Sequence, residues 1–251
     1  MRIVNKGGAI VTLLALLLAP LAVANAQVIG EPVVAEPIEG FAGTKTVNAV
    51  PSKPAPTPSL NAIVYDNTAS AANFGFTSTD LAASWGDELL TTNTGILSGM
   101  MLSIFNSGSS AGPLLTANIG VQLFDAGTSA LLGSYSTNVN FGAGLAAGFY
   151  TLVNVTNLDP FAINLNVTDV IVVQTVVSKT GAANRLGIAS LNPPTVGSSP
   201  NYMYIAATTV GAPGFYNVQQ GPANPAYQVQ VALPPVGTQS STWGRVKKLY
   251  R

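Results

Sequence analysis

The sequence predicts an all-β protein, a single antiparallel β-sandwich that is jelly-roll-like, with a disordered N-terminal region and a short C-terminal helix or tail. Two observations predict this fold. About ten short apolar or alternating runs recur from residue 61 to residue 233, separated by Gly, Asn, Ser and Pro. No window keeps a helical period over three turns, and the 25 glycines and 17 prolines would interrupt such a helix.

Residues 1–26 have the pattern of a secretory signal peptide. Arg2 and Lys6 precede an apolar run, and small residues up to Ala26 offer a cleavage site. An uncleaved membrane anchor is the alternative, but the run is shorter than the ~20 residues that a bilayer span needs. We therefore expect cleavage near Ala26, a secreted or cell-surface protein, and no transmembrane segment in the mature chain.

Residues 27–60 are expected to form a Pro-rich, solvated spacer before the folded domain. Six prolines fall between Pro32 and Pro58. Proline cannot donate a hydrogen bond to a β-ladder and favours extended coil. The sequence therefore predicts that the sandwich domain begins at residue 61 and ends at residue 233, with a linker and tail over 234–251.

Several runs in this domain predict particular strands. GILSGMMLSIF is apolar on both faces, which indicates a strand buried in the core. NIGVQLFDAGTSALLGSYST predicts a hairpin with its turn at DAGTS, and DVIVVQTVVS is rich in the β-branched residues that favour strands. AYQVQVAL alternates apolar residues with Gln228 and Gln230, so one of its faces is expected to meet water.

Charge and composition exclude several classes of function for the domain. Residues 61–233 hold two basic and seven acidic side chains, a net charge of −5, so the domain cannot neutralise a row of phosphates and no nucleic acid is expected as a partner. The chain has no Cys and no His. This removes the commonest zinc and copper ligand sets, and also Ser-His and Cys-His catalysis. We expect no cofactor and no metal.

Asp87 and Glu88, in SWGDELL, are the only adjacent carboxylates in the domain. Such a pair could bind calcium, or act as the acid and base of glycoside hydrolysis. Adjacent side chains on a strand point to opposite faces, so the two would converge only in a turn. The preferred interpretation is a polar turn entering a strand, and no catalytic activity is expected.

Carbohydrate binding is the rival function. β-Sandwich modules hold sugars with exposed aromatic rings, and Tyr202, Tyr204 and Tyr216 are the candidate contacts. Trp85, Phe215 and Tyr227 are further aromatic candidates. The alternative is that these rings fill the core, where large aromatic side chains usually lie.

The domain resembles an exported bacterial sandwich domain found among PEP-CTERM and choice-of-anchor surface proteins. The resemblance rests on AIVYDNTASAANFGF, WGDELLTTNTGILSGMMLSIFN, VQLFDAGTSALLGSYST and DVIVVQTVVS in that order, and it covers about residues 61–233. It implies a cell-surface protein and carries over no catalytic residue. The sequence departs from the PEP-CTERM pattern, because it has no Pro-Glu-Pro motif followed by an apolar helix and an Arg cluster.

The tail STWGRVKKLYR stands where such an anchor would be. A helix of about two turns would place Trp243 and Tyr250 near one face, ringed by cations. Three interpretations stay open: a disordered end, an address read by export or sorting machinery, and attachment to anionic lipid or cell-envelope polysaccharide. The candidate sorting or attachment residues are Trp243, Gly244, Arg245, Lys247, Tyr250 and Arg251.

The sequence thus predicts a structural or adhesive bacterial surface protein, with a carbohydrate-binding module as the alternative. Its oligomeric state is left open.

Overall fold

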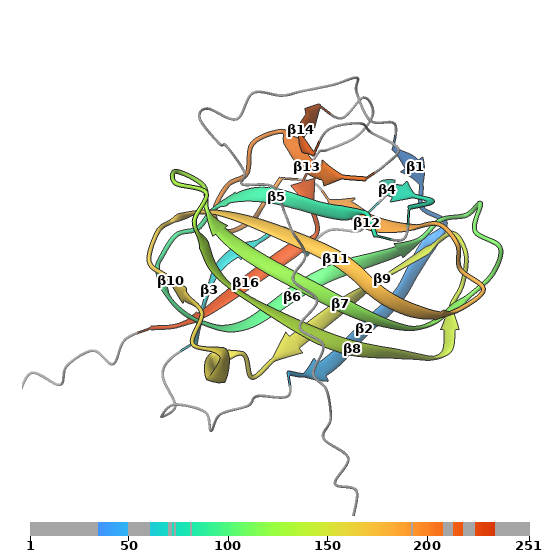
Figure 1. The fold of residues 1–251 in the computed structure, drawn as a ribbon, viewed down its shortest axis with the longest axis horizontal. Coiled ribbons are helices and arrows are strands. Elements are labelled where there is room, and N and C mark those ends of the chain that lie inside the picture. The colour runs from blue at the N-terminus through green and yellow to red at the C-terminus, as the bar shows by residue number, and fades with distance from the viewer. Residues whose placement is uncertain are drawn as a thin grey trace, which may run out of the picture.

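Figure 1 shows the fold in a computed structural model of the chain. The structure describes residues 35–49, 61–69, 72, 74–80, 82–191, 193–207, 213–217 and 224–233. The expected signal peptide (1–26) and the expected linker and tail (234–251) lie outside the described residues, so they stay predictions.

Two β-sheets pack face to face and confirm the predicted all-β sandwich. The six-stranded sheet has the order β14 (Gly214–Asn217), β13 (Tyr202–Ala206), β5 (Ser84–Leu90), β11 (Asp169–Gly181), β7 (Leu114–Asp125) and β8 (Leu131–Leu145). The main path of the ten-stranded sheet is β1 (Glu36–Pro37), β4 (Phe74–Ser78), β12 (Leu186–Leu191), β6 (Gly95–Asn106), β16 (Tyr227–Ala232) and β3 (Asn61–Asp66). Four further strands join it: β2 (Gly40–Asn48), β9 (Phe149–Thr156), β10 (Asn164–Leu165) and β15 (Asn224–Pro225).

Helical structure in the described part of the chain is limited to one 3₁₀ turn, η1 (Asp159–Phe161). Among those residues, no helix is long and apolar enough to cross a membrane.

Strand β6 organises the ten-stranded sheet. It pairs with β16 and β12 along one edge and with β9 and β10 along the other. Nine of its twelve residues are buried, which confirms the core strand predicted from GILSGMMLSIF. A strand that is covered on both faces must be apolar on both, and this is the pattern that the sequence shows.

Strands β7 and β8 form the predicted hairpin. The turn lies at DAGTS, where Asp125 Oδ1 accepts the backbone N–H groups of Gly127 at 2.8 Å and Thr128 at 3.1 Å. The Asp side chain thus stabilises the turn by replacing backbone hydrogen bonds. Ile119 on one arm and Tyr135 on the other point into the core.

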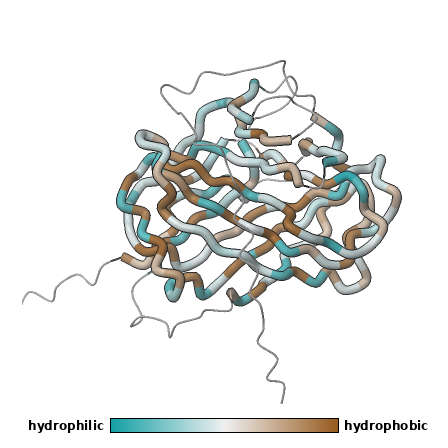
Figure 2. Tube along the Cα trace, in the orientation of Figure 1, coloured by the Kyte–Doolittle hydropathy of each residue, from teal (hydrophilic) through white to brown (hydrophobic). Residues whose placement is uncertain are grey.

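The main core lies between the two sheets and draws on both of them. Figure 2 shows hydrophobic residues along the strands that cross the middle of the molecule. Tyr227, Val229 and Val231 of β16 are buried there, which confirms the predicted alternation. The opposite face of β16 is less wet than expected, because Gln228 is only 9% exposed and donates to Asp66 Oδ2 at 2.9 Å.

The expected boundary at residue 61 is wrong, because residues 36–48 of the predicted spacer form β1 and β2. We call residues 35–49 the arm. Strand β2 pairs with β9 in parallel, from Gly40 beside Phe149 to Asn48 beside Thr156, whereas the other strand pairs are antiparallel. The prolines concealed these strands, although Pro37 lies at the end of a two-residue edge strand, where proline is tolerated.

Candidate functional site: strand β5 and the strap that closes over it

Strand β5 carries both candidate carboxylates in the middle of the six-stranded sheet. It pairs with β13 on one side and β11 on the other, with Asp87 opposite Val172 and Glu88 opposite Ile171. The expected polar turn is therefore wrong, since the whole of SWGDELL is strand. Because the segment is a strand, the two side chains point to opposite faces: Asp87 faces the interior, and Glu88 faces outward.

Gly86 explains why a turn-like sequence forms this strand. A Cβ atom at Gly86 would lie 2.3 Å from the carbonyl oxygen of Val172 and 3.3 Å from the Cβ of Tyr204. The glycine thus permits the close approach of neighbouring strands and does not mark a turn.

Asp87 is fully buried, and one hydroxyl group serves both of its carboxyl oxygens. Ser199 Oγ lies 2.9 Å from Oδ1 and 2.9 Å from Oδ2. Burial raises the pKa of Asp87 well above its usual range, and the hydrogen bond from Ser199 opposes that rise. The buried hydroxyl groups of Tyr65 and Tyr227 have raised pKa values for the same reason, burial first and the nearby Asp87 charge second.

A neutral carboxylic acid, which the raised pKa of Asp87 favours, can keep the contact with Ser199. In the protonated form, Asp87 donates to Ser199 Oγ, and the Ser199 hydroxyl donates in turn to the carbonyl oxygen of Pro200 at 3.2 Å. In this form each of the two hydroxyl hydrogens has an acceptor, and Asp87 carries no charge.

Ser199 belongs to residues 193–201, which we call the strap. The strap binds the ten-stranded sheet through Asp66, whose N–H donates to Val196 O at 3.0 Å, and the six-stranded sheet through Leu90, whose N–H donates to Ser198 O at 2.8 Å. The Asp87–Ser199 contact fastens the strap to the core. The strap therefore joins the two sheets by backbone hydrogen bonds.

Glu88 has a separate partner on the outer face of the sheet. Tyr202 donates to Glu88 Oε2 at 2.7 Å. Burial raises the pKa of Glu88, the Tyr202 hydrogen bond opposes the rise, and the Asp169 carboxylate adds to it. Within the described residues, no group of three or more His, Cys, Asp or Glu side chains is placed to hold a metal ion.

The aromatic side chains proposed as a sugar platform mostly belong to hydrophobic clusters. Tyr204 is 1% exposed and Tyr216 is 2% exposed, so neither ring can stack on a sugar, and their assignment as glycan contacts is wrong. Tyr202 alone of the three is half-buried, with its ring 5.0 Å from that of Phe215. The further aromatic candidates are buried as well: Trp85, Phe215 and Tyr227.

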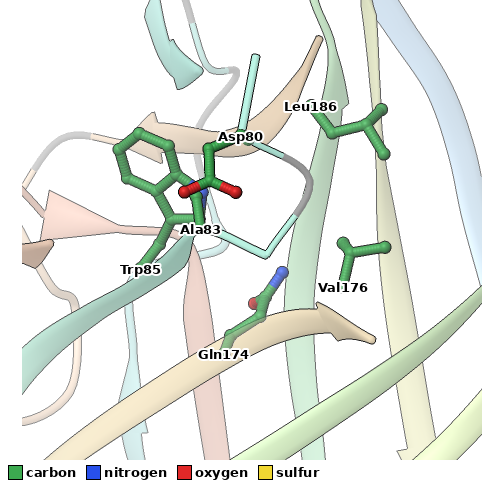
Figure 3. A pocket seen from close by; sticks show the side chains of 7 residues that line it. Asp80, Ala83, Trp85, Gln174, Val176 and Leu186 are labelled. Atoms are coloured by element: carbon green, nitrogen blue, oxygen red, sulfur yellow. The ribbon is translucent and has the colours of Figure 1, made fainter. Parts of the chain in front are cut away.

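A shallow pocket of about 250 Å³, including open solvent at its mouth, was not foreseen from the sequence. Figure 3 shows Gln174 on one side of it and Asp80 and Trp85 on the other. Gln174 Nε2 donates to Ser103 O at 2.7 Å, whereas its buried Oε1 accepts no hydrogen bond among the described residues. The enclosed part has room for about one water molecule.

The sorting or attachment residues between Trp243 and Arg251 lie outside the described residues. Their assignment stays a prediction. A comparison of the chain with protein-family models, curated proteins and solved structures finds no match.

Proposed function

We propose that this protein is an exported bacterial surface protein with a structural or adhesive role and no catalytic activity. One observation carries the proposal: the side chains of the described body that are best suited to chemistry contribute to the fold. Asp87 fastens the strap inside the sandwich, and Glu88 is bound to Tyr202 on the outer face. Two of the three rings proposed to bind sugar pack in the hydrophobic clusters.

The resemblance to sandwich domains of PEP-CTERM and choice-of-anchor proteins supports the same role. In this proposal the chain is cleaved near Ala26 and reaches the surface or the medium. N-terminal sequencing of the secreted protein tests this step, with Gln27 expected as the first residue. A protein that keeps residues 1–26, or that stays inside the cell, contradicts it.

The proposed task of the C-terminal tail is sorting or attachment at the envelope. Deleting residues 238–251 and fractionating the culture tests this task, with a Gly/Ser tail of equal length as the matched control. Both variants are expected to lose their place at the surface. If both reach the same compartment in the same amount as the wild type, the tail has no such role.

A carbohydrate-binding function retains one candidate ring, the half-buried Tyr202. Binding on a glycan array that disappears in Tyr202→Ala, in a protein whose unfolding midpoint is unchanged, would favour that function over a purely structural one. An array with no hit supports the structural role.

A further inference from the structure

Strand β2 is exposed to an unusual degree for a strand of this sandwich. None of its nine residues is buried: five are exposed, and four are half-buried. By contrast, five of the eight residues of β9, the strand on which it lies, are buried. Val47 of β2 packs against the main core. With no fully buried residue, β2 adds little apolar burial, which is the main source of stability in a sheet, and its backbone pairing holds most of it in place.

The pairing of β2 with β9 differs from the other strand pairs in its direction and has one break in its register. It is parallel, and parallel pairs are slightly less stable per residue than antiparallel ones. The register is interrupted between Phe41 and Thr44, where Gly43 has a φ of +88°. Side-chain contacts lie on both sides of this break: Thr151 Oγ1 donates to Gly43 O at 2.6 Å, Thr156 Oγ1 donates to Asn48 Oδ1 at 2.6 Å, and the Phe41 ring lies 4.9 Å from that of Tyr150.

The edge of β9 that pairs with β2 nevertheless has to be covered. Leu152, Val153 and Val155 of β9 are buried, and β2 lies between β9 and the edge strand β8 of the other sheet (Figure 1). Without β2, the edge of β9 would present unpaired backbone groups next to apolar side chains, which is a template for pairing with another strand. The segment that fits this edge is the arm itself.

Glu36, near the N-terminal end of the arm, makes three polar contacts with side chains of the sandwich. Glu36 Oε1 lies 2.6 Å from Arg185 Nη2 and accepts from Thr77 Oγ1 at 2.7 Å. Glu36 Oε2 accepts from Ser107 Oγ at 2.6 Å. Arg185 is one of only two basic side chains in residues 61–233, so the domain offers the Glu36 carboxylate few other cations to bind. These partners of the arm all come from residues after 61, and a second copy of the chain offers the same partners.

The connection from β2 to β3 has more residues than the span within one copy requires. In the sheet, β2 and β3 are separated by β9, β6 and β16, which is four strand spacings or about 19 Å. Residues 50–60 contain four prolines, and a Pro-rich segment of that length reaches roughly 34 Å at ~3.1 Å per residue. The contour length of this segment therefore exceeds the span that it bridges within one copy.

We propose that the arm, residues 35–49, of one copy seats on β9, β4 and Arg185 of a second copy, and that this exchange links copies of the chain. The inference rests on the proposed structural function and names the partner as the chain itself. An arm makes the same contacts on its own sandwich as on the sandwich of a second copy. The protein concentration therefore sets the fraction of arms that are exchanged. An exchange that does not close on itself extends into a filament.

Cross-linking tests the exchange without disturbing the core, because the chain has no cysteine. Thr46 of β2 and Asn154 of β9 are Cα partners on the outside of the sheet. Purified Thr46→Cys and Asn154→Cys proteins are mixed and treated with a short bifunctional thiol reagent, and the linked peptides are identified by mass spectrometry. The exchange predicts a 46–154 link between chains, severalfold above control, that grows with protein concentration.

The control is a mixture of Asn118→Cys and Asn138→Cys. These positions are Cα partners in the β7–β8 hairpin, which the proposal leaves within one chain. Equal yields of interchain link in the two mixtures overturn the exchange. So does a yield that stays at the control level at the highest concentration reached.

Charge exchange gives a second, independent readout. Glu36→Lys sets two cations against each other within one chain, and Arg185→Glu sets two carboxylates against each other. In a mixture of the two variants, each arm finds an opposite charge only on the other protein. Mixed assemblies are therefore expected from the mixture, and few or none from either variant alone. A mixture that behaves as the sum of its components contradicts the exchange.

The same experiments separate this inference from the proposed function. Polymers that form without 46–154 links between chains leave the structural role standing and reject the exchange. A protein with interchain links that neither reaches the surface nor forms polymers there keeps the exchange and rejects the structural role.

Discussion

Replacing Asp87 with asparagine should change how the free energy of unfolding depends on pH, and should leave that free energy nearly unchanged near pH 4. Asp87 is fully buried and is bonded to one serine hydroxyl, and burial raises the pKa of its carboxyl group. The amide of Asp87→Asn can donate to Ser199 Oγ just as the neutral acid does. We therefore expect the variant to be as stable as the wild type near pH 4, and more stable at pH 7–8.

The sign follows from proton linkage. An Asp in the unfolded chain has a pKa of about 3.9, and the folded-state pKa of Asp87 lies above that value, so the folded protein binds the extra proton between them. The stabilisation is complete below the unfolded pKa and is lost as pH rises toward the folded pKa. Over that window the free energy of unfolding falls by up to about 1.4 kcal/mol per pH unit, because one proton is released on unfolding.

Urea denaturation at a series of pH values between 4 and 8 measures this difference. The raised pKa values of Glu88 and Asp169 give slopes of the same sign, so the readout is the difference between wild type and variant. Glu88→Gln is the matched control, and a smaller change is expected because Glu88 is only half-buried. Parallel pH curves for the wild type and Asp87→Asn would refute the reasoning. So would a variant that is less stable than the wild type at pH 7 by more than about 1 kcal/mol, the size of one net hydrogen bond.

Three further predictions concern the strap and the core. Ser199→Ala leaves a buried carboxyl group without its hydroxyl partner, so we expect a loss of about 1–3 kcal/mol in urea denaturation, and faster hydrogen exchange at the Leu90 amide. Gly197→Ala places a Cβ 2.5 Å from the carbonyl oxygen of Leu90 at a φ of +74°, whereas Gly142→Ala has a similar φ of +66° and open space. The first should therefore lower the unfolding midpoint clearly more than the second, and equal losses would contradict the close contact. Tyr204→Ala should cost about 3–5 kcal/mol of stability, as large buried rings do, and an unchanged midpoint would show that the ring is not in the core.

Local patterns predicted the centre of the sandwich well. The strand β6 could be read from a run that is apolar on both faces, and β16 from strict alternation around Tyr227 and Val229. The β7–β8 hairpin followed from the Asp125 turn. In each of these cases the information lies within about twenty residues of the chain, where side-chain period and turn chemistry act directly.

The parts that sequence reasoning missed depend on contacts between distant residues. The arm is stabilised by β9, with Phe41 beside Tyr150, and by Arg185, so nothing near the arm in sequence marks it as a strand. Asp87 and Ser199 are 112 residues apart, and no local pattern reveals that one fastens the other. The sequence does not decide whether Tyr204 and Tyr216 are buried, because a lone aromatic residue suits a core and a binding surface equally.

Electron cryo-microscopy of material from the surface of the producing cells tests the central claim most directly. The account predicts copies of the two-sheet body in a repeating assembly, with β2 of one copy on β9 of the next. Protein that occurs only as single copies, free of the envelope and of other copies at every concentration examined, would contradict it.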